Sequence, residues 1–132
     1  MGEAYQLDCK QCSYNHKVFL GIGFNYINLK TILGWYKQEE GRQQIKKYMN
    51  EEDVYFECYD GLYVCEQCGY LLNRPFLHII SKDYYYINNY DCPRCHVQMP
   101  QKPLLDEIEE ISLKCPDCEK EKLEIQAYMD WD

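Results

Sequence analysis

The sequence lacks the features that would place it in a membrane or on nucleic acid. Its longest uninterrupted apolar run, Val18 to Phe24, is far shorter than the roughly 20 residues that a membrane-spanning helix needs. The first residues, Met1 to Ala4, contain no apolar segment of the kind found in secretory signals, so we expect a cytoplasmic protein. The 14 Lys and Arg residues are outnumbered by 22 Asp and Glu residues. The resulting net charge of −8 argues against nucleic acid as a partner.

Large apolar residues are scarce as well. Leu, Ile, Val and Phe together number 30 of the 132 residues, a low fraction for a globular chain. A chain of this length can bury only a modest core, so we expect it to need a further source of stability. No linker rich in Gly, Ser or Pro interrupts it.

Cysteine, in contrast, is abundant. Two thiolates three residues apart on a tight turn point into one concavity, and two such turns supply the four ligands of a tetrahedral zinc ion. Eight of the nine cysteines form four Cys-x-x-Cys pairs, here called knuckles one to four: Cys9/Cys12, Cys65/Cys68, Cys92/Cys95 and Cys115/Cys118. They predict two structural zinc sites with four cysteine ligands each.

Disulfide bonds are the alternative use for so many cysteines. Disulfide-rich domains are secreted proteins, and the expected absence of a secretory signal favours a reducing compartment and metal ligation. The ninth cysteine, Cys58, has no partner in the sequence. We expect it to be a small buried side chain on a strand.

The pairing of the knuckles is predicted from their spacing. Knuckles three and four are 19 residues apart, which is typical of one zinc ribbon, and each has a proline directly after its first cysteine. One site is therefore expected from Cys92, Cys95, Cys115 and Cys118. By elimination the other site would be formed by Cys9, Cys12, Cys65 and Cys68. An interleaved pairing, as in cross-braced zinc fingers, is an open alternative.

The segment from Asp91 to Trp131 resembles a zinc ribbon of the rubredoxin-like class, in which knuckles lie at the ends of short β-hairpins. The stretch from Tyr63 to Tyr70 resembles a ribbon knuckle too, and the whole layout is similar to small uncharacterised bacterial proteins with paired four-cysteine zinc ribbons. The resemblance implies a small, metal-stapled, β-rich α+β fold. We expect an N-terminal ribbon with a helical insertion in residues 1–90 and a C-terminal ribbon in residues 91–132.

The helical insertion is predicted between knuckles one and two, where the apolar period changes. One helix is expected after Asn28, and a second short helix after Gly41, with Ile45, Tyr48 and Met49 buried. The apolar face of the first helix consists of Leu29, Ile32, Leu33 and Tyr36.

The remaining segments have the composition of strands. Asp60-Gly61 predicts a hairpin turn within Val54–Cys68. A second β pair is expected from Phe76–Ile80 and Tyr84–Ile87, and the alternation in Lys122–Trp131 predicts a half-buried strand.

Catalysis is not expected. A closed four-cysteine site leaves no open coordination position on zinc, and the sequence has no arrangement of serine, histidine and acid and no phosphate-binding loop.

The charge distribution favours a protein partner over nucleic acid. Residues 1–53 hold seven basic and seven acidic side chains, whereas residues 54–132 hold seven basic and fifteen acidic ones. We therefore expect a protein-interaction module, of adaptor or regulatory type, with structural zinc. Two alternatives are a rubredoxin-like electron carrier and an acidic inhibitor that mimics nucleic acid and acts on a nucleic-acid enzyme.

Overall fold

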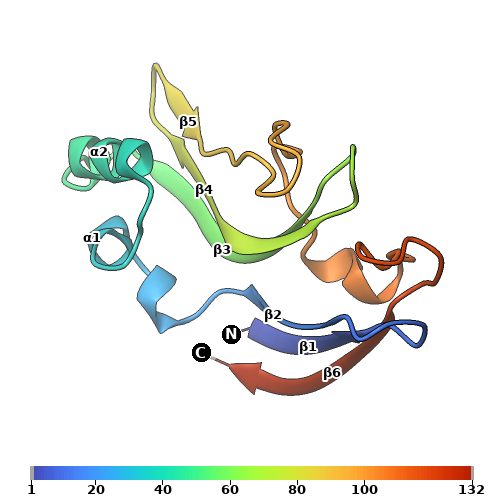
Figure 1. The fold of residues 1–132 in the computed structure, drawn as a ribbon. Coiled ribbons are helices and arrows are strands. Elements are labelled where there is room, and N and C mark those ends of the chain that lie inside the picture. Colours follow the sequence, from blue (N-terminus) through green and yellow to red (C-terminus); the bar gives the residue numbers. More distant parts are fainter. Residues whose placement is uncertain (1, 132) are drawn as a thin grey trace.

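The computed structural model describes residues 2–131, and their fold is built on one antiparallel sheet with the strand order β5-β4-β3-β2-β1-β6 (Figure 1). The strands are β1 (Gly2–Asp8), β2 (Asn15–Gly21), β3 (Tyr55–Val64), β4 (Leu71–Ile80), β5 (Tyr85–Ile87) and β6 (Glu124–Trp131). The helices are η1 (Phe24–Tyr26), α1 (Leu29–Leu33), α2 (Glu39–Tyr48) and η2 (Asp106–Glu109). Within residues 2–131 no helix is long and apolar enough to cross a membrane.

The sheet consists of two three-stranded halves that meet at a narrow seam. Strands β2 and β3 share a single register pair, Gly21 with Asp60. Beside it, the side chain of Asn73 on β4 accepts a hydrogen bond from the Phe19 N–H at 2.8 Å and donates to the Phe19 carbonyl at 3.0 Å. The same amide donates to the Gly61 carbonyl at 3.0 Å. The Asn73 side chain thus replaces backbone pairing where the halves separate.

The segment 103–113 lies between the separated halves (Figure 1). Leu104 exchanges two backbone hydrogen bonds with Leu62 of β3, at 2.9 and 3.0 Å. Ile108 and Leu113 are buried in a cluster with residues of β1, β2, β3 and β4. This cluster comprises Tyr5, Leu7, Cys9, Val18, Leu20, Leu62, Leu71, Ile108, Leu113, Cys115 and Leu123. The connection before knuckle four therefore supplies part of the main core.

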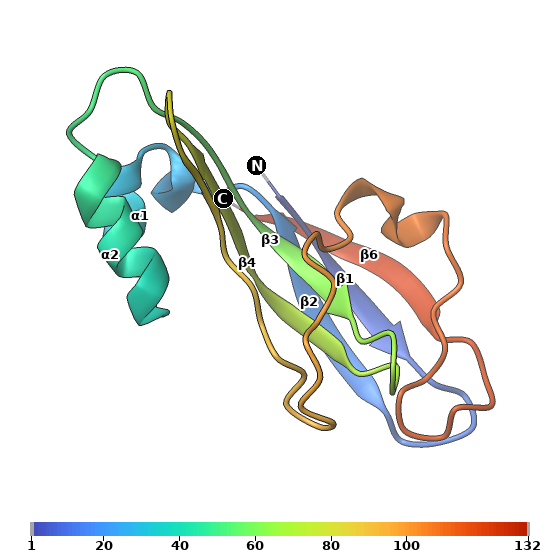
Figure 2. The ribbon, with the colours of Figure 1, turned by 90° about the horizontal axis from the view of Figure 1, so that it is seen from above.

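The two helices of the insertion pack on the other side of β3 and β4 (Figure 2). All four apolar positions expected on the first helical face are buried or half-buried, although α1 ends at Leu33. The second helix begins before Gly41 rather than after it. A Cβ atom on Gly41 would come within 2.3 Å of the Tyr36 ring, so this glycine allows the two helices to pack closely. The prediction of a helical insertion between knuckles one and two is confirmed.

The hairpin expected at Asp60-Gly61 is wrong. Strand β3 runs without interruption from Tyr55 to Val64 and turns into β4 at knuckle two. Segment 103–113 packs so closely on β3 at Gly61 that there is no room for a side chain there. An added Cβ would lie 2.4 Å from Pro103 Cγ. The glycine permits close packing rather than a turn.

The other strand predictions are confirmed in position. Strand β4 continues to Ile80, and after a short turn β5 follows, with the Ser81 N–H bonded to the Tyr84 carbonyl at 2.8 Å. The C-terminal strand exists as β6, but it is an edge strand and largely exposed rather than half-buried. It pairs with β1 along its length, so one sheet contains strands from both segments, 1–90 and 91–132, that the sequence assigned to separate ribbons.

We predict that Gly61→Ala lowers the free energy of unfolding by about 1–3 kcal/mol, because the new methyl group would overlap the Pro103 ring. Urea unfolding of the metal-loaded protein measures the loss. In a Pro103→Ala background the same substitution should cost much less. An equal loss in both backgrounds would show that the contact with Pro103 is not the cause.

Candidate metal centres

Each of the four knuckles closes a short antiparallel pair of residues. The pairs are Asp8 with Asn15, Val64 with Leu71, Asp91 with Gln98 and Lys114 with Lys122. In each knuckle the N–H of the first cysteine bonds to a carbonyl on the returning chain, at 2.8–3.1 Å. The knuckles are thus the turns of hairpins, as the resemblance to zinc ribbons implies. These hairpin pairs do not by themselves show which knuckles share a centre.

Three of the knuckles share a further backbone feature at the residue after the second cysteine. Gly69, His96 and Glu119 have positive φ angles of 80°, 67° and 59°. Each donates its N–H to the carbonyl of the first cysteine at 2.9–3.0 Å. For His96 and Glu119 the left-handed conformation costs about 1–2 kcal/mol, and the closed turn maintains it. Among the described residues, Ser13 of knuckle one does not share this conformation.

The order of the strands brings knuckles one and four together at one end of the sheet. Strand β1 lies between β2 and β6, and its last residue, Asp8, is in register with both Asn15 and Glu124. The β1–β2 turn and the turn that leads into β6 therefore lie side by side. This end carries the outer centre, composed of Cys9, Cys12, Cys115 and Cys118.

Knuckles two and three form the second group. Knuckle two is the turn between β3 and β4, and knuckle three lies in the chain that follows β5, which pairs with β4. Their sulfurs form the inner centre, composed of Cys65, Cys68, Cys92 and Cys95. In both centres the first cysteine of each knuckle is buried and the second is half-buried.

The pairing expected from spacing is therefore wrong. Cys92 and Cys95 do not join Cys115 and Cys118, and Cys9 and Cys12 do not join Cys65 and Cys68. The interleaved alternative is wrong too, because the centres are nested: the inner one uses the middle knuckles and the outer one the terminal knuckles. The spacing of 19 residues reports only chain length, whereas strand pairing decides which turns become neighbours.

The geometry of both centres fits a tetrahedral ion. Within each centre the four sulfur atoms all lie within 4.8 Å of one another. The Sγ–Sγ distance is 3.6 Å for Cys9–Cys118, and 3.5 Å for Cys12–Cys115, Cys65–Cys95 and Cys68–Cys92. Four sulfurs at about 2.3 Å from zinc would be about 3.8 Å apart. Small relaxation of the side chains would therefore accommodate the ion.

The electrostatics of the outer centre also favour a cation. The N–H groups of Lys120 and Glu121 donate to Cys118 and lower its pKa to about 7. At Cys12 the Tyr14 N–H favours the thiolate, but desolvation and the neighbouring sulfurs outweigh it and raise the pKa to about 12. One thiolate thus opposes the ionisation of the next. A bound dication would remove this conflict and allow all four thiols to ionise.

The ninth cysteine lies outside both centres. Cys58 is 3% exposed on β3, among the residues that pack against the helices, as expected for a small buried side chain. Burial raises the pKa of its thiol to about 12. Among the described residues no histidine joins either centre.

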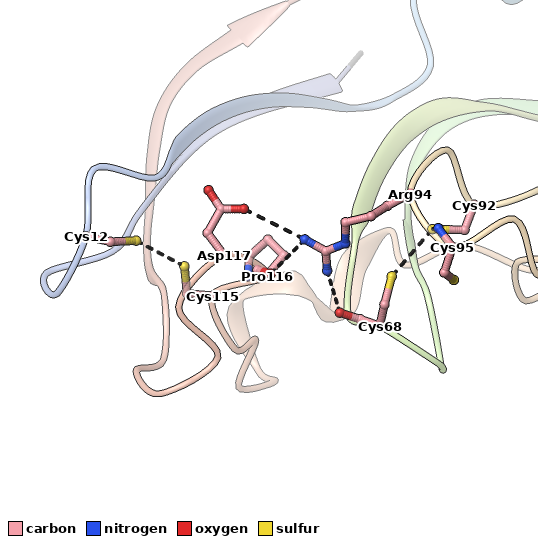
Figure 3. A network of polar contacts seen from close by, with 8 residues as sticks. All are labelled: Cys12, Cys68, Cys92, Arg94, Cys95, Cys115, Pro116 and Asp117. Atoms are coloured by element: carbon pink, nitrogen blue, oxygen red, sulfur yellow. Dashed lines mark hydrogen bonds and ion pairs between the residues drawn. The ribbon is translucent and has the colours of Figure 1, made fainter.

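One residue that the sequence analysis passed over is Arg94, inside knuckle three. Figure 3 shows its guanidinium between the two centres, directed toward Cys68 on one side and toward Pro116 and Asp117 on the other. The sequence marks this residue only as a cation inside a Cys-x-x-Cys turn. Its contact with knuckle four depends on the nested pairing, which the spacing of the knuckles does not predict.

Comparisons with known proteins add no relative: no family model, curated protein or solved structure matches the chain. The two four-cysteine groups are compatible with zinc-ribbon-like sites, and this compatibility rests on the structure alone.

The nested pairing predicts how paired substitutions change the metal content. Cys9→Ser combined with Cys115→Ser removes two ligands from the outer centre, so one ion per chain should remain. Cys9→Ser combined with Cys65→Ser removes one ligand from each centre and should deplete both. Elemental analysis of the desalted variants gives the count. One tightly bound ion in the second variant would contradict the nested pairing.

Proposed function

We propose that the chain is a zinc-binding protein whose two four-cysteine centres are structural and that it acts as a protein-interaction module. The observation that carries this proposal is that both thiol sets are complete, with four sulfurs each and N–H groups directed at them. Four cysteine ligands in a tetrahedral arrangement are typical of structural zinc. Such a set leaves no position for a substrate or a reactive water, which supports a role other than catalysis.

The rubredoxin-like alternative uses the same ligands for iron. Because a tetrahedral set of four thiolates accepts both metals, the identity of the metal distinguishes a structural protein from an electron carrier. The measured metal content therefore decides between these two functions.

A row of exposed apolar side chains supports the interaction role. Tyr55, Ile80 and Tyr85 are register partners on the adjacent strands β3, β4 and β5, so their side chains share one face of the sheet. They are 76%, 38% and 63% exposed. The next register row, Phe56, Ile79 and Tyr86, points the opposite way and packs against the helices.

Exposed tyrosines next to an aliphatic side chain are typical of the centre of protein interfaces. Polar residues border the row: Glu57 and His78 lie on the same face, with a carboxylate oxygen and Nδ1 3.6 Å apart. This arrangement of an apolar row with a polar border favours a protein partner.

We predict that the purified protein holds two zinc ions per chain and little iron, and that a chelator unfolds it. Each structural zinc site contributes on the order of 10 kcal/mol of folding free energy at neutral pH, and the chain has little other core. Elemental analysis, circular dichroism and limited proteolysis with and without chelator test this. Cys58→Ser is the control and should retain both ions.

Two outcomes would contradict this prediction in different ways. Predominantly iron with visible colour would favour the electron carrier. Retained structure after complete metal removal would show that the metal does not stabilise the fold.

We predict that Tyr55→Ser with Tyr85→Ser weakens binding to the cellular partner by about tenfold, because both rings would lose buried contact area. Affinity capture identifies the partner, and titration with the purified partner measures the loss. Phe24→Ser, at another exposed apolar residue, is the matched control. Equal binding by the double variant and the control would exclude this row as the interface. A basic nucleic-acid enzyme as the partner would favour the acidic-inhibitor alternative.

A further inference from the structure

Arg94 belongs to the inner centre by its position in the chain. It lies between the ligands Cys92 and Cys95, and its Nη2 donates a hydrogen bond of 2.6 Å to the backbone carbonyl of Cys68. Its guanidinium carbon lies 5.5 Å from the centroid of the Tyr70 ring. A side chain from knuckle three is thus attached to knuckle two, across the inner centre.

The same guanidinium also contacts the outer centre. Its Nη1 donates a hydrogen bond of 2.8 Å to the carbonyl of Pro116, which lies between Cys115 and Cys118. The Asp117 carboxylate is 3.8 Å from the same nitrogen. Figure 3 shows that the Pro116 and Cys68 carbonyls are bonded to different nitrogens of the guanidinium. Arg94, itself part of knuckle three, therefore contacts knuckle two and knuckle four and connects the two centres.

We propose that Arg94 couples the two metal centres, so that the metal in one centre slows the release of metal from the other. This inference rests on the proposed zinc-binding function and adds a positioning residue to it. The planar guanidinium can donate to two carbonyls at once in fixed directions, which the point-like ammonium of lysine cannot do.

The physical basis is that the two ends of the Arg94 contact, its stem in knuckle three and the Pro116 carbonyl in knuckle four, depend on different ions. The backbone around Cys92 and Cys95 fixes the Arg94 stem, and the inner ion holds that backbone. The Pro116 carbonyl is presented by knuckle four, which the outer ion holds. Releasing either ion frees one end of the Arg94 contact and removes its support from the other centre. The coupling between the binding free energies of the two ions is therefore reciprocal.

Charge adds to the same effect. Four thiolates and one Zn²⁺ carry a net charge of −2 in each centre, so the two filled centres repel each other. The cation between them is attracted to both.

The experiment measures zinc release from the loaded full-length chain to a chromogenic chelator. Cys12→Ser leaves only the inner centre intact, and Cys65→Ser leaves only the outer centre. If Arg94 couples them, zinc should leave the remaining centre of either variant about tenfold faster than the same centre in the parent. The Arg94→Gln variant with both centres intact should already release zinc faster than the parent does. Adding Cys12→Ser or Cys65→Ser to Arg94→Gln should increase the release rate little further.

Arg94→Lys and Arg74→Gln complete the set. Arg94→Lys keeps the charge without the two-carbonyl geometry and should restore only part of the coupling. Arg74 is an exposed arginine on β4 outside both centres, so Arg74→Gln should release zinc like the parent. The proposal would be overturned if the cysteine substitutions increased the release rate equally with Arg94 present and with Arg94 replaced. Equal release rates from Arg94→Gln and Arg74→Gln would overturn it too.

The outcomes also separate this inference from the function on which it rests. A chain that binds no zinc contradicts the proposed function. A chain that binds two zinc ions and releases them independently contradicts only the coupling through Arg94.

Discussion

The gathering of four thiols at each of two places in the sheet is the interaction on which the rest of the structure depends. Where sulfur atoms lie only 3.5–3.6 Å apart, desolvation and the neighbouring sulfurs raise the pKa of Cys12 and Cys95 to about 12, so a bound cation favours their ionisation. With a dication the same sulfurs become a cross-link between turns that are far apart in sequence. The outer group connects turns more than 100 residues apart, Cys9 with Cys118 and Cys12 with Cys115.

The centres continue into the apolar core. Cys9 and Cys115 belong to the buried cluster between the two halves of the sheet, and Cys65 and Cys92 belong to a smaller cluster around Tyr63 and Met99. The third cluster, under the two helices, contains no predicted ligand. The sequence is short of large apolar residues, and cysteines of the two centres take part of their place in the core. Two of the three clusters in residues 2–131 include such cysteines.

The narrow seam in the sheet explains how one chain accommodates both centres. Strands β2 and β3 remain together at a single register pair and then separate, with the Asn73 amide and Leu104 satisfying backbone groups on either side. The separation gives segment 103–113 room to enter the core, and the pairing of β6 with β1 places knuckle four beside knuckle one. At the same time Pro116 comes within reach of Arg94, so the two centres share a neighbour.

What the sequence determined by itself is local. The spacing of Cys-x-x-Cys specifies a turn with two inward sulfurs, and the helical period of residues 29–36 specifies an apolar face; both depend on residues a few positions apart. The tertiary structure alone decided the pairing of the knuckles, the continuation of β3 through Gly61 and the exposure of β6. These depend on strand order and on the contact of Pro103 with Gly61, and long-range packing leaves no periodic trace in the sequence.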